Sequence, residues 1–248
     1  RTMTYVALLG VVCIVACTTN LTEAKDKMNA LTNKEEKIAR ISAATARGDL
    51  PNLKLALASG LDAGLTVNEI KEVLTQLYAY CGFPRSLNAL GTFMALVNER
   101  GGTDPVGKLS GPLPVGRSLD FGTSNQTKLT GRPVEGPLME FAPAIDEFLK
   151  AHLVWDIFAR DTLDWKTREL ATISALAAMD GVESQLKSHI AIGKHNGLTD
   201  VQIEAILALV HPVPVKTSAF PVGLENTGYA QYFSGKSWLA PLTQDKRL

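Results

Sequence analysis

One histidine and one glutamate in this sequence have the chemistry and spacing of an acid–base pair. His189 lies in the segment ESQLKSHIAIGKHNGLT (183–199), and Glu169 lies in the helix predicted before it. An imidazole can donate or accept a proton near neutral pH, and a carboxylate can orient it and stabilise its protonated form. Both residues also have a structural interpretation, because a lone helical histidine is usually structural and the helix dipole favours an acid in a first turn. Both the catalytic and the structural interpretation therefore stay open for His189 and Glu169 on residue type alone.

Four further residues are candidates for binding a substrate. Gln185 precedes His189 by four positions and so shares its helix face. Arg168 could hold a substrate carboxylate, although a solvated surface position explains it equally well. His152 and Trp155 fall on an apolar helical stripe and could line a pocket, with a hydrogen-bonded core position as the alternative for the histidine. The four histidines of the chain are not clustered as metal ligands are, so no metal site is predicted.

The helices that would carry these residues belong to an internal repeat. Residues 64–70 (GLTVNEI) match residues 197–203 (GLTDVQI) at an offset of 133. Predicted helices over 34–47 and 165–179 also correspond, after one residue of slippage. An ordered series of matches with one small gap indicates a duplicated unit.

Each repeat carries the same local signals for a second and a third helix. The second helix ends at Gly64 or Gly197, and glycine is typical of the left-handed residue after a helix. The third helix begins at Thr66 or Thr199, each followed three positions later by Glu or Gln in the pattern of a capping box. Short loops between the helices favour an antiparallel helical bundle.

The Asp180-Gly181 turn predicts how the acid–base pair is brought together. A turn this short forces the helices before and after it to run antiparallel. His189 and Glu169 then lie at similar heights, because each helix rises about 1.5 Å per residue. We expect the two side chains to converge, provided that each faces inward.

The predicted fold class is all-α, with two helical bundle repeats joined by a Gly/Pro-rich connector. The connector holds eight Gly and five Pro in 37 residues, which opposes long helices and predicts an extended segment with turns. Helical spacing resumes over 141–158, whereas Pro, Gly and aromatic residues after His211 predict an irregular C-terminal segment. The predicted boundaries are 1–20 for an N-terminal segment, 21–100 for the first repeat, 101–137 for the connector and 138–248 for the second repeat with its C-terminal segment.

The N-terminal segment has the pattern of an export signal. Residues 5–17 are uncharged and apolar, too short a run to cross a bilayer, which needs about 20 residues, but suited to a signal peptide. The sequence Ile14-Val15-Ala16-Cys17 resembles a bacterial lipobox, which predicts lipidation of Cys17. The expected location is the bacterial cell envelope, periplasmic or lipid-anchored, with no other membrane contact. If the segment is instead a buried helix, the expected location is the cytoplasm.

Charge and cysteine content exclude two further classes. Lys+Arg and Asp+Glu both number 25, so no basic excess indicates a nucleic-acid partner. Cys81 is the one cysteine after the N-terminal segment, so no intramolecular disulfide is expected in the folded part. The sequence contains no CxxC motif.

Motifs of both repeats resemble the carboxymuconolactone decarboxylase family. The second repeat carries LDWxxRELAT, QLxxH and NGLT, and the first carries LTxxEI and YCGFP. The resemblance implies an all-helical fold of the alkylhydroperoxidase-D-like type and a homo-oligomer, with a trimer favoured. It also implies that His189 matches the family's histidine and that Glu169 falls where the family has an acid. The first repeat has Ala56 in place of the histidine.

The resemblance also bears on the peroxidase branch of the same superfamily. That branch uses a CxxC motif followed four residues later by a histidine. Counting back from His189 places the two cysteine positions at Val182 and Gln185, and neither is a thiol. A reducible disulfide centre needs two thiols, so thiol peroxidase activity is not expected.

Two hypotheses about function follow. In the first, the chain is a lyase that decarboxylates a small organic acid or lactone without a cofactor, using His189 as proton donor and Glu169 to orient it. In the second, it is an exported binding or scaffold protein that retained the fold without catalysis. The degenerate first repeat and the export signal fit the second hypothesis.

Overall fold

The computed structural model describes residues 30–211, 224–225 and 238–239 of the chain. The described residues divide into two units, one ending at His211 and one beginning at Pro212. The predicted signal segment and Cys17 lie outside the described residues. So does most of the predicted irregular C-terminal segment.

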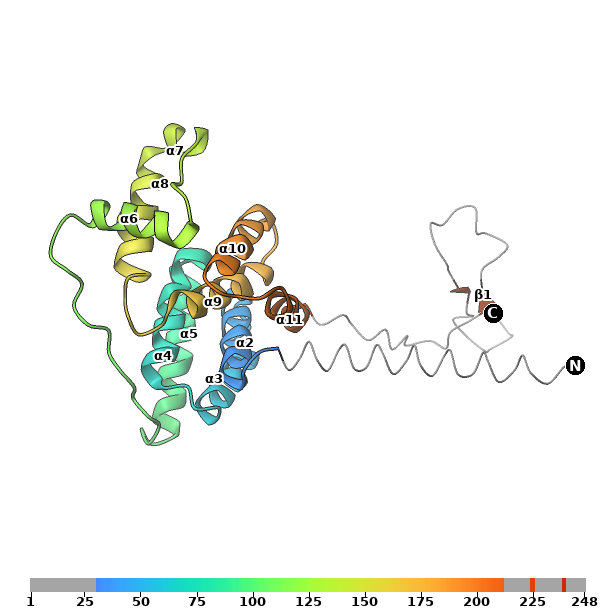
Figure 1. The fold of residues 1–248 in the computed structure, drawn as a ribbon. Coiled ribbons are helices and arrows are strands. Elements are labelled where there is room, and N and C mark those ends of the chain that lie inside the picture. Colours follow the sequence, from blue (N-terminus) through green and yellow to red (C-terminus); the bar gives the residue numbers. More distant parts are fainter. Residues whose placement is uncertain (1–29, 212–223, 226–237, 240–248) are drawn as a thin grey trace, which may run out of the picture. The chain divides into compact units, whose positions relative to one another are not determined.

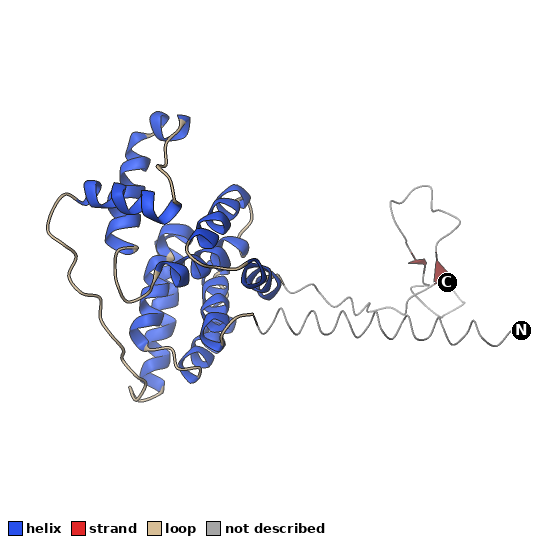
Figure 2. Ribbon diagram, viewed as in Figure 1, coloured by secondary structure: helices blue, strands red, loops and turns tan. Residues whose placement is uncertain are grey.

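The first unit is built of helices throughout, as the all-α prediction required (Figures 1 and 2). The first repeat comprises α2 (Asn33–Arg47), α3 (Leu50–Asp62), α4 (Val67–Gln76) and α5 (Tyr78–Glu99). The second comprises α9 (Trp165–Ala177), α10 (Glu183–His195) and α11 (Asp200–Val210). Between them lie α6 (Ser118–Thr130), α7 (Pro137–Phe141), α8 (Pro143–Glu147) and the π-helix η1 (Phe148–Ile157).

Side-chain caps fix where the helices of the repeats begin. Thr66 and Thr199 each accept a hydrogen bond from the third backbone N–H of their helix, and Glu69 and Gln202 reach back to the cap residue. Both predicted capping boxes are therefore confirmed. Asp164 caps α9 in a related way by accepting from the backbone N–H of Thr167.

The first helix of each repeat lies at the centre of the core. Helix α2 packs against α9, α3 and α11, and α9 packs in turn against α10. Helix α9 is buried on all sides, since every residue from Arg168 to Ala177 is buried. One continuous apolar cluster therefore joins the two repeats, and Ile41 of α2 and Ile173 of α9 lie in it without solvent contact.

Glycines at equivalent positions let the second helix of each repeat approach the first. A Cβ atom at Gly193 of α10 would lie 2.8 Å from Leu198 Cδ1 and 2.9 Å from Ile173 Cδ1. A Cβ atom at Gly60 of α3 would lie 3.1 Å from Ile41 Cδ1. The repeat seen in the sequence is thus repeated in the packing.

The connector differs from its prediction because it contains a helix. Residues 118–130 form α6, which packs along η1 (Figure 1). The approach is close enough that a Cβ atom at Gly122 would meet the carbonyl oxygen of Lys150 at 1.9 Å. Asn196 and His195, at the end of α10, bind the carbonyl oxygens of Leu129 and Lys128 at 2.8 and 3.1 Å. Gly122 therefore permits α6 and η1 to pack closely, whereas the Gly/Pro content of the connector had predicted an extended chain.

The helical spacing predicted over 141–158 is realised in pieces. Ala142 interrupts the helix between α7 and α8, where Pro143 begins the next turn. The chain then continues as the π-helix η1, whose buried residues Val154 and Ile157 join Leu129 in a second apolar cluster. Across the described residues, no helix is both long and apolar enough to cross a membrane.

In the second unit the structure describes one pair of short strands. Strands β1 (Leu224–Glu225) and β2 (Trp238–Leu239) pair antiparallel, with Leu224 opposite Leu239.

Candidate active site

His189 and Glu169 meet at the contact between α10 and α9. His189 Nδ1 lies 2.8 Å from Glu169 Oε2, as the antiparallel packing predicted. The Glu169 side chain is fully buried, whereas 17% of the His189 side chain is exposed. With Nδ1 engaged by the carboxylate, Nε2 is the nitrogen left for a ligand, and no described residue binds it.

Gly193 explains how the two helices come close enough for this bond. It lies one helical turn after His189 on the face toward α9, where its missing side chain leaves room for Ile173 and the Glu169 Cβ atom. Sequence reasoning missed this residue. The signal was present, because a glycine inside a predicted helix often marks a close helix contact.

Tyr80 of the first repeat completes the surroundings of the pair. Its ring meets the His189 imidazole edge to face, with centroids 5.3 Å apart. The hydroxyl at its far end is out of contact with solvent and has no hydrogen-bond partner among the described residues. Burial and the nearby Glu169 carboxylate raise the pKa of Tyr80 far above its ordinary value of 10.0, so the hydroxyl stays neutral. Sequence reasoning had placed Tyr80 only within a family-like motif.

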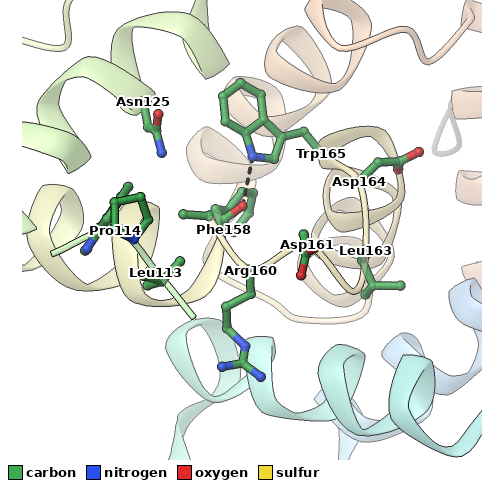
Figure 3. Close-up of a pocket in the computed structure, with 11 residues that line it drawn as sticks. Leu113, Pro114, Asn125, Phe158, Arg160, Asp161, Leu163, Asp164 and Trp165 are labelled. Carbon is green, nitrogen blue, oxygen red and sulfur yellow. Dashed lines mark hydrogen bonds between the residues drawn. The ribbon is translucent and has the colours of Figure 1, made fainter. Parts of the chain in front are cut away.

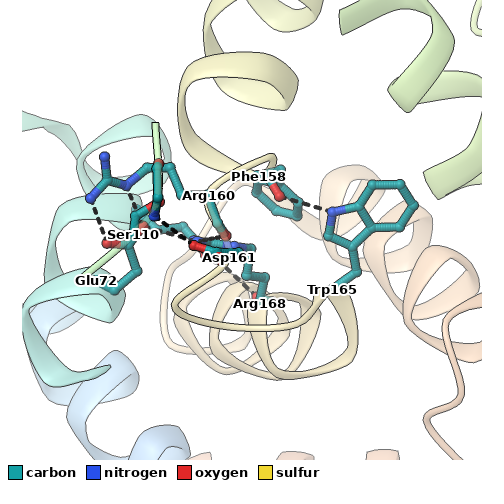
Figure 4. A network of polar contacts seen from close by, with 9 residues as sticks. Glu72, Ser110, Phe158, Arg160, Asp161, Trp165 and Arg168 are labelled. Atoms are coloured by element: carbon teal, nitrogen blue, oxygen red, sulfur yellow. Dashed lines mark hydrogen bonds and ion pairs between the residues drawn. The ribbon is translucent and has the colours of Figure 1, made fainter. Parts of the chain in front are cut away.

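Arg168 is buried, whereas the sequence predicted either a substrate-binding residue or a solvated surface position. It is fully buried and donates to Gln76 Oε1 at 3.0 Å, to Glu72 Oε1 at 2.9 Å and to the carbonyl oxygen of Arg160 at 2.8 Å. These partners belong to α4 and to the loop before α9, so Arg168 joins the two repeats (Figure 4). The sequence could not reveal this, because Glu72 lies 96 residues away from Arg168 in the chain.

The same network holds Glu72 ionised. Burial would raise the pKa of Glu72, but hydrogen bonds from Arg160 and Arg168 outweigh it and lower the pKa below the ordinary 4.5. Arg160 donates Nε and Nη2 to the two carboxylate oxygens at 2.7 and 3.1 Å, a bidentate pair. Gln76 extends the network to Thr172, whose hydroxyl oxygen accepts from Gln76 Nε2 at 2.8 Å.

The predicted binding residues Gln185 and His152 are exposed and make their hydrogen bonds to residues other than His189. Gln185 is exposed and accepts a hydrogen bond from Ser184 Oγ at 2.9 Å. His152 is also exposed, where it contacts the Tyr78 hydroxyl and lies 2.7 Å from the Asp156 carboxylate. Neither the pocket nor the core position considered for His152 is therefore found.

Trp155 does line a pocket, but a different one from the surroundings of His189 (Figure 3). The pocket is an open hollow of about 420 Å³ between the connector and the loop before α9. Trp155 stacks on Phe121 with ring centroids 4.5 Å apart, and Trp165 donates Nε1–H to the carbonyl oxygen of Phe158 at 2.9 Å. At its rim, Lys108 and the backbone N–H of Gly111 bind Asp161 and lower its pKa to about 2.

The described residues include one cysteine, whose surroundings disfavour a reactive thiolate. Cys81 is the free cysteine there, and its thiol donates to the carbonyl oxygen of Leu77 at 3.2 Å. Burial raises the pKa of Cys81, which disfavours the reactive thiolate. Over the same residues, no group of three or more His, Cys, Asp and Glu side chains is placed to hold a metal ion.

The equivalent position of the first repeat carries no acid–base pair. Ala56 stands where the second repeat has His189, and it is buried. Glu36 and Lys37 lie near the position equivalent to Glu169. Glu36 forms ion pairs with both Lys37 and Arg40. Only the second repeat therefore has the histidine–glutamate arrangement within the described chain.

Comparison with known proteins identifies the family. The Carboxymuconolactone decarboxylase family matches residues 16–93 and 143–222, more than half of the chain. The two matches fall on the two repeats found in the sequence. The chain belongs to this family, as a member with two tandem copies of its unit. A search among curated proteins found no significant match to the chain.

Proposed function

We propose that this protein is a cofactor-independent carboxy-lyase of the carboxymuconolactone decarboxylase type, acting on a small organic acid or lactone. One observation carries the proposal. A buried carboxylate binds one nitrogen of His189 at 2.8 Å, while the imidazole remains partly exposed and no described residue binds its other nitrogen. This is the arrangement of a general acid–base histidine with its orienting carboxylate.

The proposed reaction is a decarboxylation next to a conjugated carbonyl. The bond between the carboxylate carbon and its neighbour breaks, carbon dioxide leaves, and the electron pair passes into the adjoining carbonyl as an enolate. His189 in its protonated form donates a proton from Nε2 to carbon, which gives the product. Glu169 stabilises the imidazolium before the transfer, and solvent returns the proton to His189 afterwards.

A second candidate is a binding or scaffold protein without catalysis. The observation that favours it is the loss of the histidine from the first repeat, where Ala56 is buried in the core. One repeat has thus kept the fold without the acid–base pair. Binding in the hollow lined by Trp155 and Trp165, with no turnover, is the expected behaviour under this candidate.

We further propose a homo-oligomer, a trimer in preference, exported to the bacterial cell envelope and lipidated on Cys17. The support for an oligomer is a set of large apolar side chains that are at least half exposed on α7, α8 and η1. These are Leu138, Phe141, Ile145 and Phe148. Such an exposed apolar stripe is typical of a surface that another chain covers.

The test is carbon dioxide release from γ-carboxymuconolactone by the wild-type protein and by His189→Asn. The asparagine amide can still donate to Glu169 from the place of Nδ1, but it cannot transfer a proton. We expect kcat to fall by about 10²–10⁴-fold with the melting temperature little changed. His195→Gln, on the same helix, is the matched control and should keep wild-type activity. Binding of the lactone without carbon dioxide release by the wild-type protein would favour the second candidate.

A further inference from the structure

Two polar atoms beside the acid–base pair are buried and lack hydrogen-bond partners among the described residues. One is Oε1 of Glu169, the carboxylate oxygen that His189 does not use. The other is the hydroxyl oxygen of Tyr80. A buried polar atom without a partner destabilises the folded protein, so such atoms are rare unless they have a role. Here an acceptor and a donor are found in the same small region.

The two groups come from different repeats and lie within electrostatic range of each other. The Glu169 carboxylate raises the pKa of Tyr80, and the Tyr80 ring packs edge to face on the His189 imidazole. The hydroxyl also faces the Thr172 side chain, one turn after Glu169 on α9, and this interaction lowers the pKa of Tyr80 and so partly offsets burial and Glu169. The Tyr80 ring therefore contacts His189, and its hydroxyl lies within electrostatic range of Glu169.

From this placement we propose that Tyr80 is a positioning residue for the His189–Glu169 pair. Its neutral hydroxyl donates to Glu169 Oε1, directly or through one bridging water, while Oε2 accepts from His189 Nδ1. The hydroxyl is out of contact with solvent, so it acts through Glu169 and does not touch the substrate. A donor to Oε1 fixes the plane in which Oε2 meets the imidazole.

The positively charged side chains near Glu169 donate mainly to other groups, so we assign the donor to Glu169 Oε1 to Tyr80. Within the described part of the chain, Glu169 forms its ion pair with His189 of α10. The neighbouring Arg168 of α9 donates Nη1 to Gln76 and Nη2 to Glu72 of α4, and its buried Nε has no partner among the described residues. On α2, Lys37 and Arg40 pair with Glu36.

The polar network that joins the repeats holds Tyr80's surroundings in place. Gln76 Nε2 donates to Thr172 Oγ1 and to the carbonyl oxygen of Arg168, both at 2.8 Å. The first repeat, which has no histidine of its own at this position, thus supplies a group that the second repeat's pair requires. The inference rests on the proposed function for its catalytic consequence, but the geometry can be tested without turnover.

The experiment compares the wild-type protein with Tyr80→Phe and with the matched control Tyr78→Phe. Tyr78 lies two residues before Tyr80 on α5, and its hydroxyl contacts the exposed His152. The first readout is the proton resonance of His189 Nδ1–H by NMR, with no substrate present. We expect Tyr80→Phe to shift or broaden this resonance and Tyr78→Phe to leave it unchanged.

The second readout is decarboxylation of γ-carboxymuconolactone. Loss of the positioning hydroxyl should lower kcat by about tenfold or more while KM changes little, since a group that acts through Glu169 does not bind substrate. If the wild-type protein releases no carbon dioxide, the proposed function fails and the resonance alone decides the role of Tyr80.

A Tyr80 hydroxyl that does not bind Glu169 predicts a different result. A hydroxyl that is unpaired in the folded protein destabilises it, so Tyr80→Phe would then raise the melting temperature and leave the His189 resonance unchanged. That outcome would overturn the inference. If Tyr80→Phe does not fold, 3-fluorotyrosine at position 80 provides the same test, because its more acidic hydroxyl should move the resonance without removing any atom that packs.

Discussion

Glu169 is the residue on which the proposed chemistry depends most. A carboxylate with no solvent exposure is costly to bury unless it is paired, and among the described residues Glu169 forms its ion pair with His189 Nδ1. The negative charge is thereby directed at a single imidazole. Because Nδ1 is held by the carboxylate, Nε2 is the nitrogen that donates to carbon in the proposed reaction.

Replacing Glu169 by Gln removes the negative charge and keeps the size of the side chain. The amide fills the same space but cannot stabilise an imidazolium, so we expect kcat for the lactone to fall by about 10²–10⁴-fold. Steady-state kinetics measures the change. Glu183→Gln, an exposed acid at the start of α10, is the control and should retain full activity. Wild-type kcat in Glu169→Gln would remove the carboxylate from the mechanism.

The residue scale also shows where sequence reasoning succeeded and where it failed. It paired His189 with Glu169, because a short turn and a helical rise fix their relative height. It misplaced Arg168, the immediate neighbour of Glu169, because α9 is buried on every side and has no solvent face to receive it. Periodicity cannot assign a face to such a helix. The partners of Arg168 are revealed only by tertiary contacts.

At the scale of elements, the separation of α9 and α10 decides whether the pair forms. Gly193 sets this separation, because any side chain there must displace Ile173 or Leu198. Gly60 of α3 lies at the equivalent position, where an added Cβ atom would lie 3.1 Å from Ile41 Cδ1. The two glycines therefore offer a matched comparison between the repeat that has the pair and the repeat that does not.

Gly193→Val should push α10 away from α9 and lengthen the His189–Glu169 contact. Overpacking of this kind costs about 1–3 kcal/mol of unfolding free energy, which denaturant titration measures. Activity should fall by more than the loss of folded protein explains. Gly60→Val should show a stability loss of similar origin with activity preserved in the folded fraction. Equal activity losses in the two variants would contradict a specific role for the α9–α10 contact.

At the scale of the whole molecule, the buried network of Glu72, Arg160, Arg168 and Gln76 makes the two repeats one folding unit. It lies between α4 of the first repeat and the start of α9 in the second (Figure 4). Removing one partner would leave the Arg168 guanidinium buried without its counter-charge. Such uncompensated charges are among the most destabilising changes that a single substitution makes.

Glu72→Gln should therefore lower the free energy of unfolding by about 3–5 kcal/mol near neutral pH. Because the pKa of Glu72 is lowered in the folded state, its stabilisation is present above pH 4.5 and is lost as pH falls through the folded-state value. The difference between wild-type and variant should therefore shrink below pH 4.5. Glu36→Gln, which breaks a partly exposed pair with Arg40, should cost no more than about 1 kcal/mol. A constant difference for Glu72→Gln across this pH range would contradict the account.

The repeat itself was the part of the architecture most open to prediction. Matching segments at an offset of 133 and the two capping boxes predicted the helices, and the family match to both halves agrees with them. The connector was harder, because α6 depends on a close contact between Gly122 and the Lys150 backbone. Glycine usually disfavours a helix, but at Gly122 its missing side chain permits α6 to pack against η1. Only the tertiary contacts show which effect applies.

The most direct test of the central claim is hydrogen exchange on the decarboxylated product. The group that adds a proton to carbon in the forward direction must also remove it in reverse. We therefore expect the wild-type protein in D₂O to place deuterium on the product lactone carbon next to the carbonyl, measured by proton NMR, without any carbon dioxide present. His189→Asn should show only the uncatalysed rate. Exchange by His189→Asn at the wild-type rate would contradict His189 as the proton donor.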